Sequence, residues 1–185
     1  MIRAAESFEV HPPHDHDGAA HEEDAPPPIA LTVLADVLTG VGFGLLLTGG
    51  FALSGARVDW KRGAVWGAAG FAAFAAAPAL GLLPSPPGAA EAELAARQLW
   101  WVLTAACTAA ALALLAFHRS WIAIAIAVVL LAAPHVVGAP KAMTDSNLPE
   151  ALEWRFAAAS LGTTLVFWLV LGTLAGWITA RFNRA

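Results

Sequence analysis

Long hydrophobic stretches separated by short polar segments occupy the chain from residue 29 onward. An apolar helix of about 20 residues, rising 1.5 Å per residue, is long enough to cross the hydrocarbon core of a bilayer. The pattern therefore predicts an all-α integral membrane protein, a bundle of about five transmembrane helices. The predicted spans cover about residues 29–53, 64–83, 94–117, 121–137 and 152–180, within a bundle domain of residues 29–185.

Composition supports a membrane protein and argues against an enzyme. Apolar residues make up 58% of the chain and charged residues 13%, whereas soluble domains carry about a quarter charged residues. There is no phosphate-binding GxxxxGK[ST] pattern and no catalytic triad pattern, and the single cysteine, Cys107, cannot form a redox pair within the chain. No basic patch supports nucleic-acid binding.

The first 28 residues differ from the rest in being acidic, proline-rich and poor in hydrophobic residues, which is typical of a disordered tail. Within them, imidazole and carboxylate side chains alternate closely, and such N and O donors suit divalent cobalt, nickel or zinc. We interpret residues 1–28 as a metal-capture tail, the alternative being a solvated acidic linker. The predicted metal ligands of the tail are His11, His14, Asp15, His16, Asp17, His21 and Glu22.

Asp36 lies about two turns inside the first predicted span. A carboxylate at this depth is costly unless it faces protein, water or a cation. Asp36 is therefore a candidate cation ligand, and the alternative is an interfacial or helix-packing aspartate. The glycines and threonines that follow it favour close approach of a neighbouring helix.

His135 is the one titratable side chain in the apolar stretch 121–140. Pro134 precedes it, and Gly138 and Pro140 follow, so we expect the helix to break here. An ionisable residue in a membrane helix is a functional-site hypothesis. His135 is therefore a candidate metal or proton ligand, and the alternative is a histidine that meets water at the membrane interface.

The distribution of basic residues predicts the orientation of the chain. Lys and Arg concentrate in cytoplasmic loops, and the alternating spans divide them six to four. The inner set is Arg57, Lys61, Arg62, Arg119, Arg181 and Arg184, and the outer set is Arg3, Arg97, Lys141 and Arg155. The prediction is a bacterial inner-membrane protein with the histidine-rich tail outside and the C-terminus in the cytoplasm.

Three charged residues near the outer helix ends are further pathway candidates. Arg97 precedes Trp100 and Trp101 at the start of the third span, where we expect the tryptophans to mark the membrane interface. Glu153 and Arg155 open the last span, where we expect them to pair with each other or with His135. The histidine tail, the entry to the Asp36 helix and the loop after His135 would then share the outer face, which favours inward movement of a cation.

Several segments in order resemble the CbtA family, probable cobalt transporter subunits. They are DVLTGVGFGLLL (36–47), RGAVWGAAGFAAFAAAPALGLLP (62–84), ARQLWWVLTA (96–105), APHVVGAP (133–140) and RFAAASLGTTLVFWLVLGTLAG (155–176). The resemblance implies a cobalt permease component that serves cobalamin synthesis beside a small, single-span, histidine-bearing CbtB partner. It also implies a hydrophobic helix before residue 2, either missing from this protein or encoded upstream of Met1.

The leading hypothesis is a membrane transport component for uptake of a divalent transition metal, cobalt by resemblance. The alternatives are a non-transporting scaffold or assembly subunit with a metal-buffering tail, and an ion-independent permease for small molecules. A transporter needs a path at membrane depth, so the discriminating feature is whether Asp36 and His135 face a common cavity.

Overall fold

The computed structural model describes residues 29–143 and 148–183, which form helices and loops without any strand. The all-helical class is thus confirmed for this part of the chain, and the predicted ligands of the metal-capture tail lie outside it. The helices are α2 (Ile29–Ser54), α3 (Trp60–Phe71), the π-helix η1 (Ala72–Ala76), α4 (Ala77–Ala79), α5 (Leu94–Phe117), α6 (Trp121–Val137) and α7 (Glu150–Phe182).

Three helices of the described residues are long and apolar enough to cross a membrane. These are α2, α5 and α7, each with a long window of high mean hydropathy. Helix α6 is apolar but has only 17 residues. The hydrophobic stretch predicted as the second span is divided between α3, η1 and α4. The structure therefore shows a helical bundle with three candidate spans, and the presence of five spans stays a prediction.

The helix that contains α3, η1 and α4 begins at Trp60, before the predicted start at residue 64. The carboxylate of Asp59 caps it by accepting a hydrogen bond of 2.9 Å from the backbone N–H of Arg62, which satisfies one of the free donors of a first turn. In η1 the N–H of Ala77 bonds to the carbonyl of Ala72, five residues back. Pro78 follows and lacks the N–H that an α-helix would direct at the carbonyl of Phe74.

Helices α3 and α7 form the most closely packed pair, and they meet through glycines. Gly63 and Gly67 on α3 face Gly172 and Gly176 on α7, and a Cβ added at any of the four would overlap the backbone of the other helix. Two small-xxx-small motifs thus interlock, as in associating membrane helices. Farther along, Trp168 of α7 covers Gly70.

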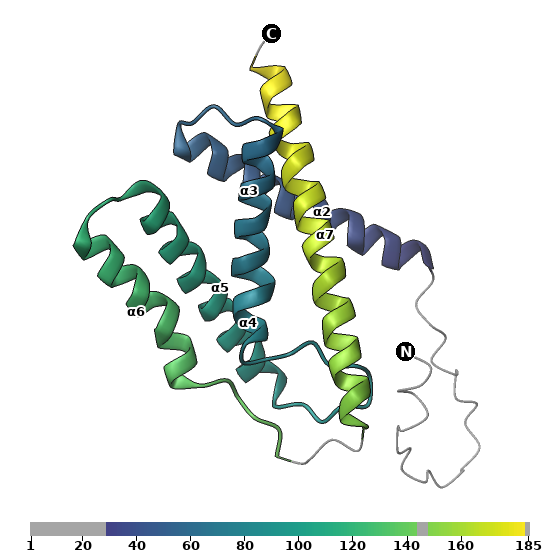
Figure 1. The fold of residues 1–185 in the computed structure, drawn as a ribbon. Coiled ribbons are helices and arrows are strands. Elements are labelled where there is room, and N and C mark those ends of the chain that lie inside the picture. The colour runs from purple at the N-terminus through teal and green to yellow at the C-terminus, as the bar shows by residue number, and fades with distance from the viewer. Residues whose placement is uncertain (1–28, 144–147, 184–185) are drawn as a thin grey trace, which may run out of the picture.

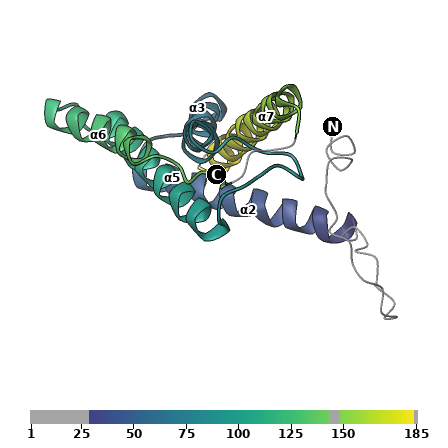
Figure 2. The same cartoon turned by 90° about the horizontal axis from the view of Figure 1, so that it is seen from below.

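Helices α5 and α6 form a second pair, an antiparallel hairpin joined by a short connection (Figure 1). The interface between them is filled by small, buried residues. Among these are Thr104 and Ala111 on α5 and Ala127 on α6, each with 0% exposure. Figures 1 and 2 show α3 between this hairpin and α7. The bundle is therefore layered as α6, α5, α3 and α7.

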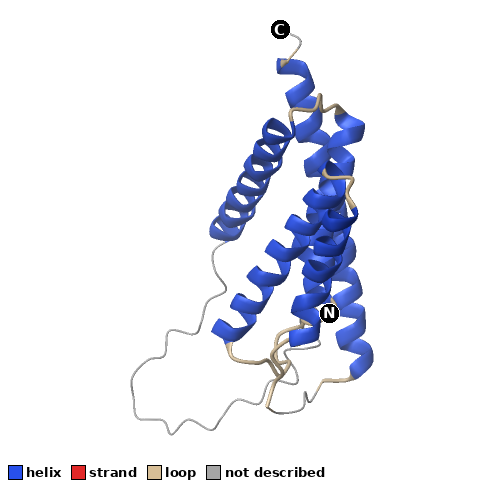
Figure 3. Ribbon diagram, turned by 90° about the vertical axis from the view of Figure 1, so that its left-hand side faces the viewer, coloured by secondary structure: helices blue, strands red, loops and turns tan. Residues whose placement is uncertain are grey.

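Helix α2 crosses the bundle and leaves it toward its N-terminus (Figure 3). Its buried residues, Leu47 and Phe51, are both in the second half and join a core with Val58, Trp168 and Ala175. The first half of α2 presents exposed apolar side chains such as Leu31 and Leu38. In a membrane, those side chains would face lipid or another protein.

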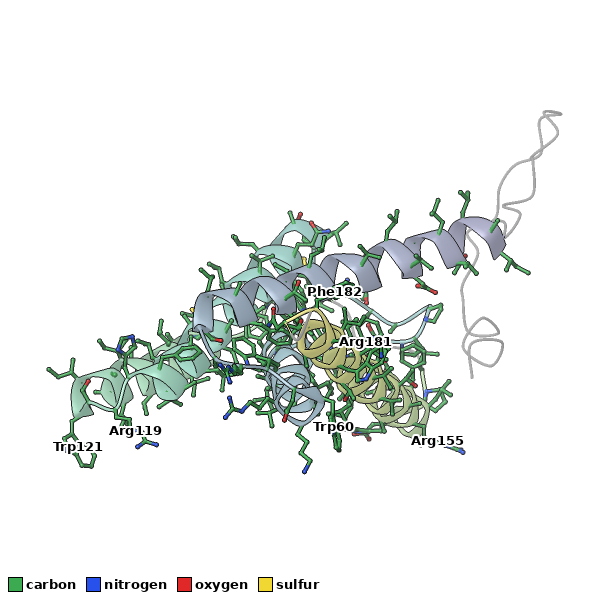
Figure 4. The ribbon with its side chains drawn as sticks, turned by 90° about the horizontal axis from the view of Figure 1, so that it is seen from above. Trp60, Arg119, Trp121, Arg155, Arg181 and Phe182 are labelled. Carbon is green, nitrogen blue, oxygen red and sulfur yellow. The ribbon has the colours of Figure 1, made fainter. Side chains whose placement is uncertain are left out.

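The two ends of the bundle differ in charge. The α2–α3 loop, the α5–α6 connection and the end of α7 lie toward one end (Figure 1), which we call the basic end. Trp60 begins α3, and Arg181 and Phe182 lie in the last turn of α7 at this end, which faces the viewer in Figure 4, with Arg119 at the tip of the hairpin. The other end, which we call the pocket end, holds the loop of residues 80–93 and the first turns of α5 and α7.

Candidate functional site

A cavity of about 730 Å³ lies between η1, α4, α5 and α7 and reaches toward the pocket end. We call it the inner pocket. A second cavity of about 330 Å³, the outer pocket, lies among the loop of residues 80–93, the start of α7 and the segment after α6. Both cavities are lined by Ser85, Glu91 and Arg97, so these residues stand at the junction between them.

Uncharged polar side chains on α5 and α7 interrupt the largely apolar lining of the inner pocket. Ser160 and Thr164 lie one turn apart and so share one face of α7, and Gln98 lies on α5. Other helical threonines, such as Thr104 and Thr163, bond the carbonyl four residues back. Within the described residues, the hydroxyls of Ser160 and Thr164 make no such bond, which leaves their oxygens available to a ligand.

An ion pair joins Arg97 and Glu91 at the junction. Both guanidinium nitrogens of the fork donate to the carboxylate, one of them over 2.8 Å, and the Ser85 hydroxyl donates to the same carboxylate over 2.5 Å. Partial burial raises the pKa of Glu91, but the hydrogen bonds from Ser85 and Arg97 outweigh it and hold that pKa below its ordinary value. Glu91 therefore neutralises Arg97 at neutral pH.

Glu153 supplies an unpartnered carboxylate oxygen to the outer pocket. Its Oε1 is buried and has no hydrogen-bond partner among the described residues. A buried carboxylate oxygen without a donor is costly, because it has lost water without gaining a partner. A cation or an ordered water in the outer pocket would relieve that cost.

The structure does not bring Asp36 and His135 together. Asp36 is exposed on the first half of α2, and the contacts of this helix are with α7 and α3. His135 is on α6, which packs on α5. Neither residue lines the inner or the outer pocket. The cavity predicted to join them is therefore not one of these two, and their roles as ligands stay predictions.

His135 packs against Trp100, and α6 is continuous at His135. The two rings meet edge to face with centroids 5.8 Å apart, and Trp100 is buried within the bundle. Helix α6 runs through Pro134 and ends at Val137, before Gly138 with φ of 88°. The Pro134 carbonyl accepts from both the Gly138 N–H and the Trp100 indole N–H.

Of the three charged pathway candidates, the structure brings two together. Arg97 and Glu153 both line the outer pocket. Arg155 is exposed and points away from the bundle (Figure 4), and its predicted pairing with Glu153 does not occur, because the one ion pair within the described residues is Arg97–Glu91. The described residues also contain no cluster of three or more His, Cys, Asp or Glu side chains that could hold a metal ion.

Five polar or charged pocket residues are not singled out by the sequence pattern: Ser85, Glu91, Gln98, Ser160 and Thr164. The spacing of Ser160 and Thr164 was a usable signal, because polar residues four apart share a helix face. The contact between Glu91 and Arg97 depends on the path of the loop before α5, for which the sequence pattern carries no comparable signal.

A helical bundle with membrane-length apolar helices and a pocket lined by both apolar and polar side chains is compatible with a membrane transport protein. The chain belongs to the CbtA family, described as probable cobalt transporter subunit, whose model matches residues 2–180. The predicted family and the predicted role in cobalt transport are thus confirmed, and the location is a membrane. No curated protein and no solved structure gave a significant match.

Proposed function

We propose that this chain is the membrane subunit through which divalent cobalt enters the cell, by way of the outer and then the inner pocket. The observation that carries the proposal is the unpartnered Oε1 of Glu153 in the outer pocket. An anionic oxygen at the entrance attracts a divalent cation, and cobalt accepts carboxylate and other oxygen donors. The cavity behind it continues with the oxygens of Ser160 and Thr164.

The shortage of strong ligands suits passage rather than storage. Conduction requires binding that is favourable enough to admit the ion and weak enough to release it. One free carboxylate followed by hydroxyl and amide groups meets that requirement better than a closed site of three or four imidazoles or carboxylates. The absence of a three-ligand cluster among the described residues is thus compatible with a transport path.

Charge supports an orientation in which the pockets open outside the cell. Five basic residues of the described chain lie at the basic end, and Glu91 neutralises Arg97 at the other, which leaves Lys141 and Arg155 there. The positive-inside rule then places the basic end in the cytoplasm. The basic-end residues are Arg57, Lys61, Arg62, Arg119 and Arg181.

The same orientation puts the histidine-rich tail on the same side of the membrane as the entrance to the outer pocket. Helix α2 ends at the basic end with Ser54, so residues 1–28 join its opposite terminus at Ile29. We propose that their imidazoles and carboxylates raise the local supply of cobalt outside the cell, in a bacterial inner membrane. Five membrane-spanning stretches, with α3, η1 and α4 acting as one, complete this topology.

The word subunit in the family description implies at least one partner. We propose a small single-span protein with a histidine, similar to CbtB, and cobalamin synthesis as the consumer of the imported cobalt. The exposed first half of α2 offers apolar side chains for contact with such a helix.

Uptake of radioactive cobalt tests the proposal in cells that lack their own cobalt importers and carry the partner gene. Glu153→Gln keeps the shape of the side chain and removes its charge, so uptake should fall sharply. Asp36→Asn is the matched comparison, because Asp36 is exposed and lines neither pocket. Loss in the Asp36 variant with normal uptake in the Glu153 variant would move the path away from the pockets.

One observation favours the second candidate, a scaffold or assembly subunit whose tail buffers metal. Asp36 and His135, the two candidate ligands predicted at membrane depth, line neither the inner nor the outer pocket. A scaffold predicts that cobalt uptake needs the chain but tolerates Glu153→Gln. The same uptake assay therefore separates the two candidates.

A further inference from the structure

We propose that Phe74 is the gate of the transport path, the side chain that separates the inner pocket from the cytoplasmic side. This inference rests on the proposed function. An apolar groove of about 360 Å³ lies between α2, α3, η1 and α5 on the side of the basic end, with Ser54, Ala56 and Phe117 among its lining residues. Within the described chain, Phe74 is the one residue that lines both this groove and the inner pocket.

Aromatic rings from three other helices hold Phe74 at this boundary. It stacks on Trp168 of α7 with centroids 5.5 Å apart and an angle of 11°. Phe43 of α2 meets it edge-on at 5.2 Å, and Trp101 of α5 lies at 6.1 Å. An apolar cluster of this kind excludes water, so a hydrated divalent cation in the inner pocket could not continue past it.

The backbone at Phe74 is suited to movement. Phe74 is the central residue of η1, and the four residues around it in η1 are alanines, which offer little steric resistance. A π-turn holds one residue more than an α-turn, and such turns are frequent at functional sites. Moving the π-turn along the helix would rotate Phe74 by roughly 100°, one residue of an α-helix, without breaking the helix.

Small residues form part of the wall of the groove beyond the gate. Ala69, Gly70 and Ala73 line it from α3 and η1, and Ala109 and Ala113 line it from α5. Helix α3 packs far less extensively on α5 than on α7. Rotation of the Phe74 ring out of its cluster would therefore join the inner pocket to the groove, which reaches Ser54 and Ala56 on the side of the basic end.

Thiol labelling tests the gate without cobalt. Cys107 is the single cysteine of the chain, so Cys107→Ser provides a background in which Thr164→Cys places one thiol in the inner pocket. In membrane vesicles of known orientation, a membrane-impermeant thiol reagent applied from the basic-end side should label this thiol slowly. Phe74→Ala should raise that rate by about tenfold or more, because the apolar barrier is gone.

Phe71→Ala is the matched control, since Phe71 lies on the same helix, is partly buried and lines neither cavity. It should leave the rate from the basic-end side unchanged. Phe74→Leu, which keeps an apolar but shorter side chain, should give an intermediate rate and covers the case in which the alanine variant does not fold. Labelling from the pocket side checks folding in every variant.

Equal rates from the basic-end side in the parent, the Phe74→Leu variant and a folded Phe74→Ala variant would overturn the gate. Because the assay needs no cobalt, its failure is distinguishable from a failure of the proposed function. Normal gating with no cobalt uptake would keep Phe74 as a barrier and reject cobalt as the substrate of this path. Cobalt uptake together with labelling rates that do not respond to the Phe74 substitutions would reject Phe74 as a barrier and keep cobalt as the substrate.

Discussion

Gly63 and Gly172 lie in backbone contact across the α3–α7 interface. A Cβ built on Gly63 overlaps the carbonyl oxygen of Gly172, and a Cβ built on Gly172 overlaps that of Gly63. Because both neighbours are backbone atoms, no side chain can move aside to make room. This contact fixes the separation of α3 and α7, and η1, which continues α3, lines the inner pocket together with α7.

Gly172→Ala should therefore destabilise the protein, by about 1–3 kcal/mol as for other overpacked sites. The measurement is the midpoint of thermal unfolding in detergent, followed by tryptophan fluorescence. Gly162→Ala is the matched control on the same helix, because nothing lies within 4 Å of a Cβ at that position. The control should be neutral or slightly stabilised, since alanine favours a helix more than glycine does. Equal losses in both variants would contradict the tight contact.

Trp100→Phe should cost little stability although its hydrogen bond is buried. The indole N–H donates to the Pro134 carbonyl over 3.1 Å. That carbonyl also accepts from the Gly138 N–H, so it keeps a partner after the substitution. We expect a loss of about 0.5–1.5 kcal/mol, the range for a net hydrogen bond, in the same unfolding assay. A much larger loss would show that the indole is needed for packing of α5 on α6.

The pair of Glu91 and Arg97 should contribute stability in a pH-dependent way. The pKa of Glu91 is lower in the folded protein than its ordinary value of 4.5. A carboxyl with a lowered pKa stabilises the fold above its unfolded pKa, and this contribution is lost as the pH falls through its folded pKa. Since the side chain of Glu91 is 41% exposed, the contribution is at most about 1 kcal/mol.

Glu91→Gln should consequently lower the unfolding midpoint at pH 7, and the difference from the parent should shrink as the pH is lowered below 4.5. Glu150→Gln serves as the control, because Glu150 is exposed and takes part in no ion pair within the described residues. A difference between Glu91→Gln and the parent that stays constant down to pH 3 would show that lost packing, not lost charge, is responsible.

Removal of the metal-capture tail should weaken cobalt uptake at low cobalt more than at saturation. If the tail has the proposed capture role, it raises the local supply of the ion without forming the path, so the concentration for half-maximal uptake should rise while the maximal rate holds. Substitution of His11, His14, His16 and His21 by serine should act in the same way. Equal losses at both concentrations would argue that the tail is part of the path.

Helix limits followed closely from the sequence where polar residues bound an apolar stretch. Residues 94–117 and 121–137 were predicted with the limits that α5 and α6 have, because His118, Arg119 and Ser120 mark the connection. The start of α3 was misplaced, because Trp60, Lys61 and Arg62 were assigned to a loop. Asp59 caps the helix before them, and a cap is a local contact that a hydropathy pattern does not reveal.

The candidate site was less predictable, because it depends on packing. Arg97 and Glu153 were singled out from their charge and position, and both line the outer pocket. The π-turn at Phe74 has no pattern of its own in an alanine-rich segment. The break predicted from Pro134, Gly138 and Pro140 comes after Val137, and the helix runs through Pro134 itself because a proline removes only one hydrogen bond.

The measurement that most directly tests the pocket as the cobalt path is uptake by two variants of neighbouring threonines. Thr164 lines the inner pocket, whereas Thr163 is exposed and bonds back to the Ala159 carbonyl. Valine replaces either side chain at nearly constant volume and removes its hydroxyl. The path through the inner pocket predicts that Thr164→Val lowers cobalt uptake by about tenfold while Thr163→Val leaves it unchanged. Equal uptake by the two variants, at equal amounts in the membrane, would contradict it.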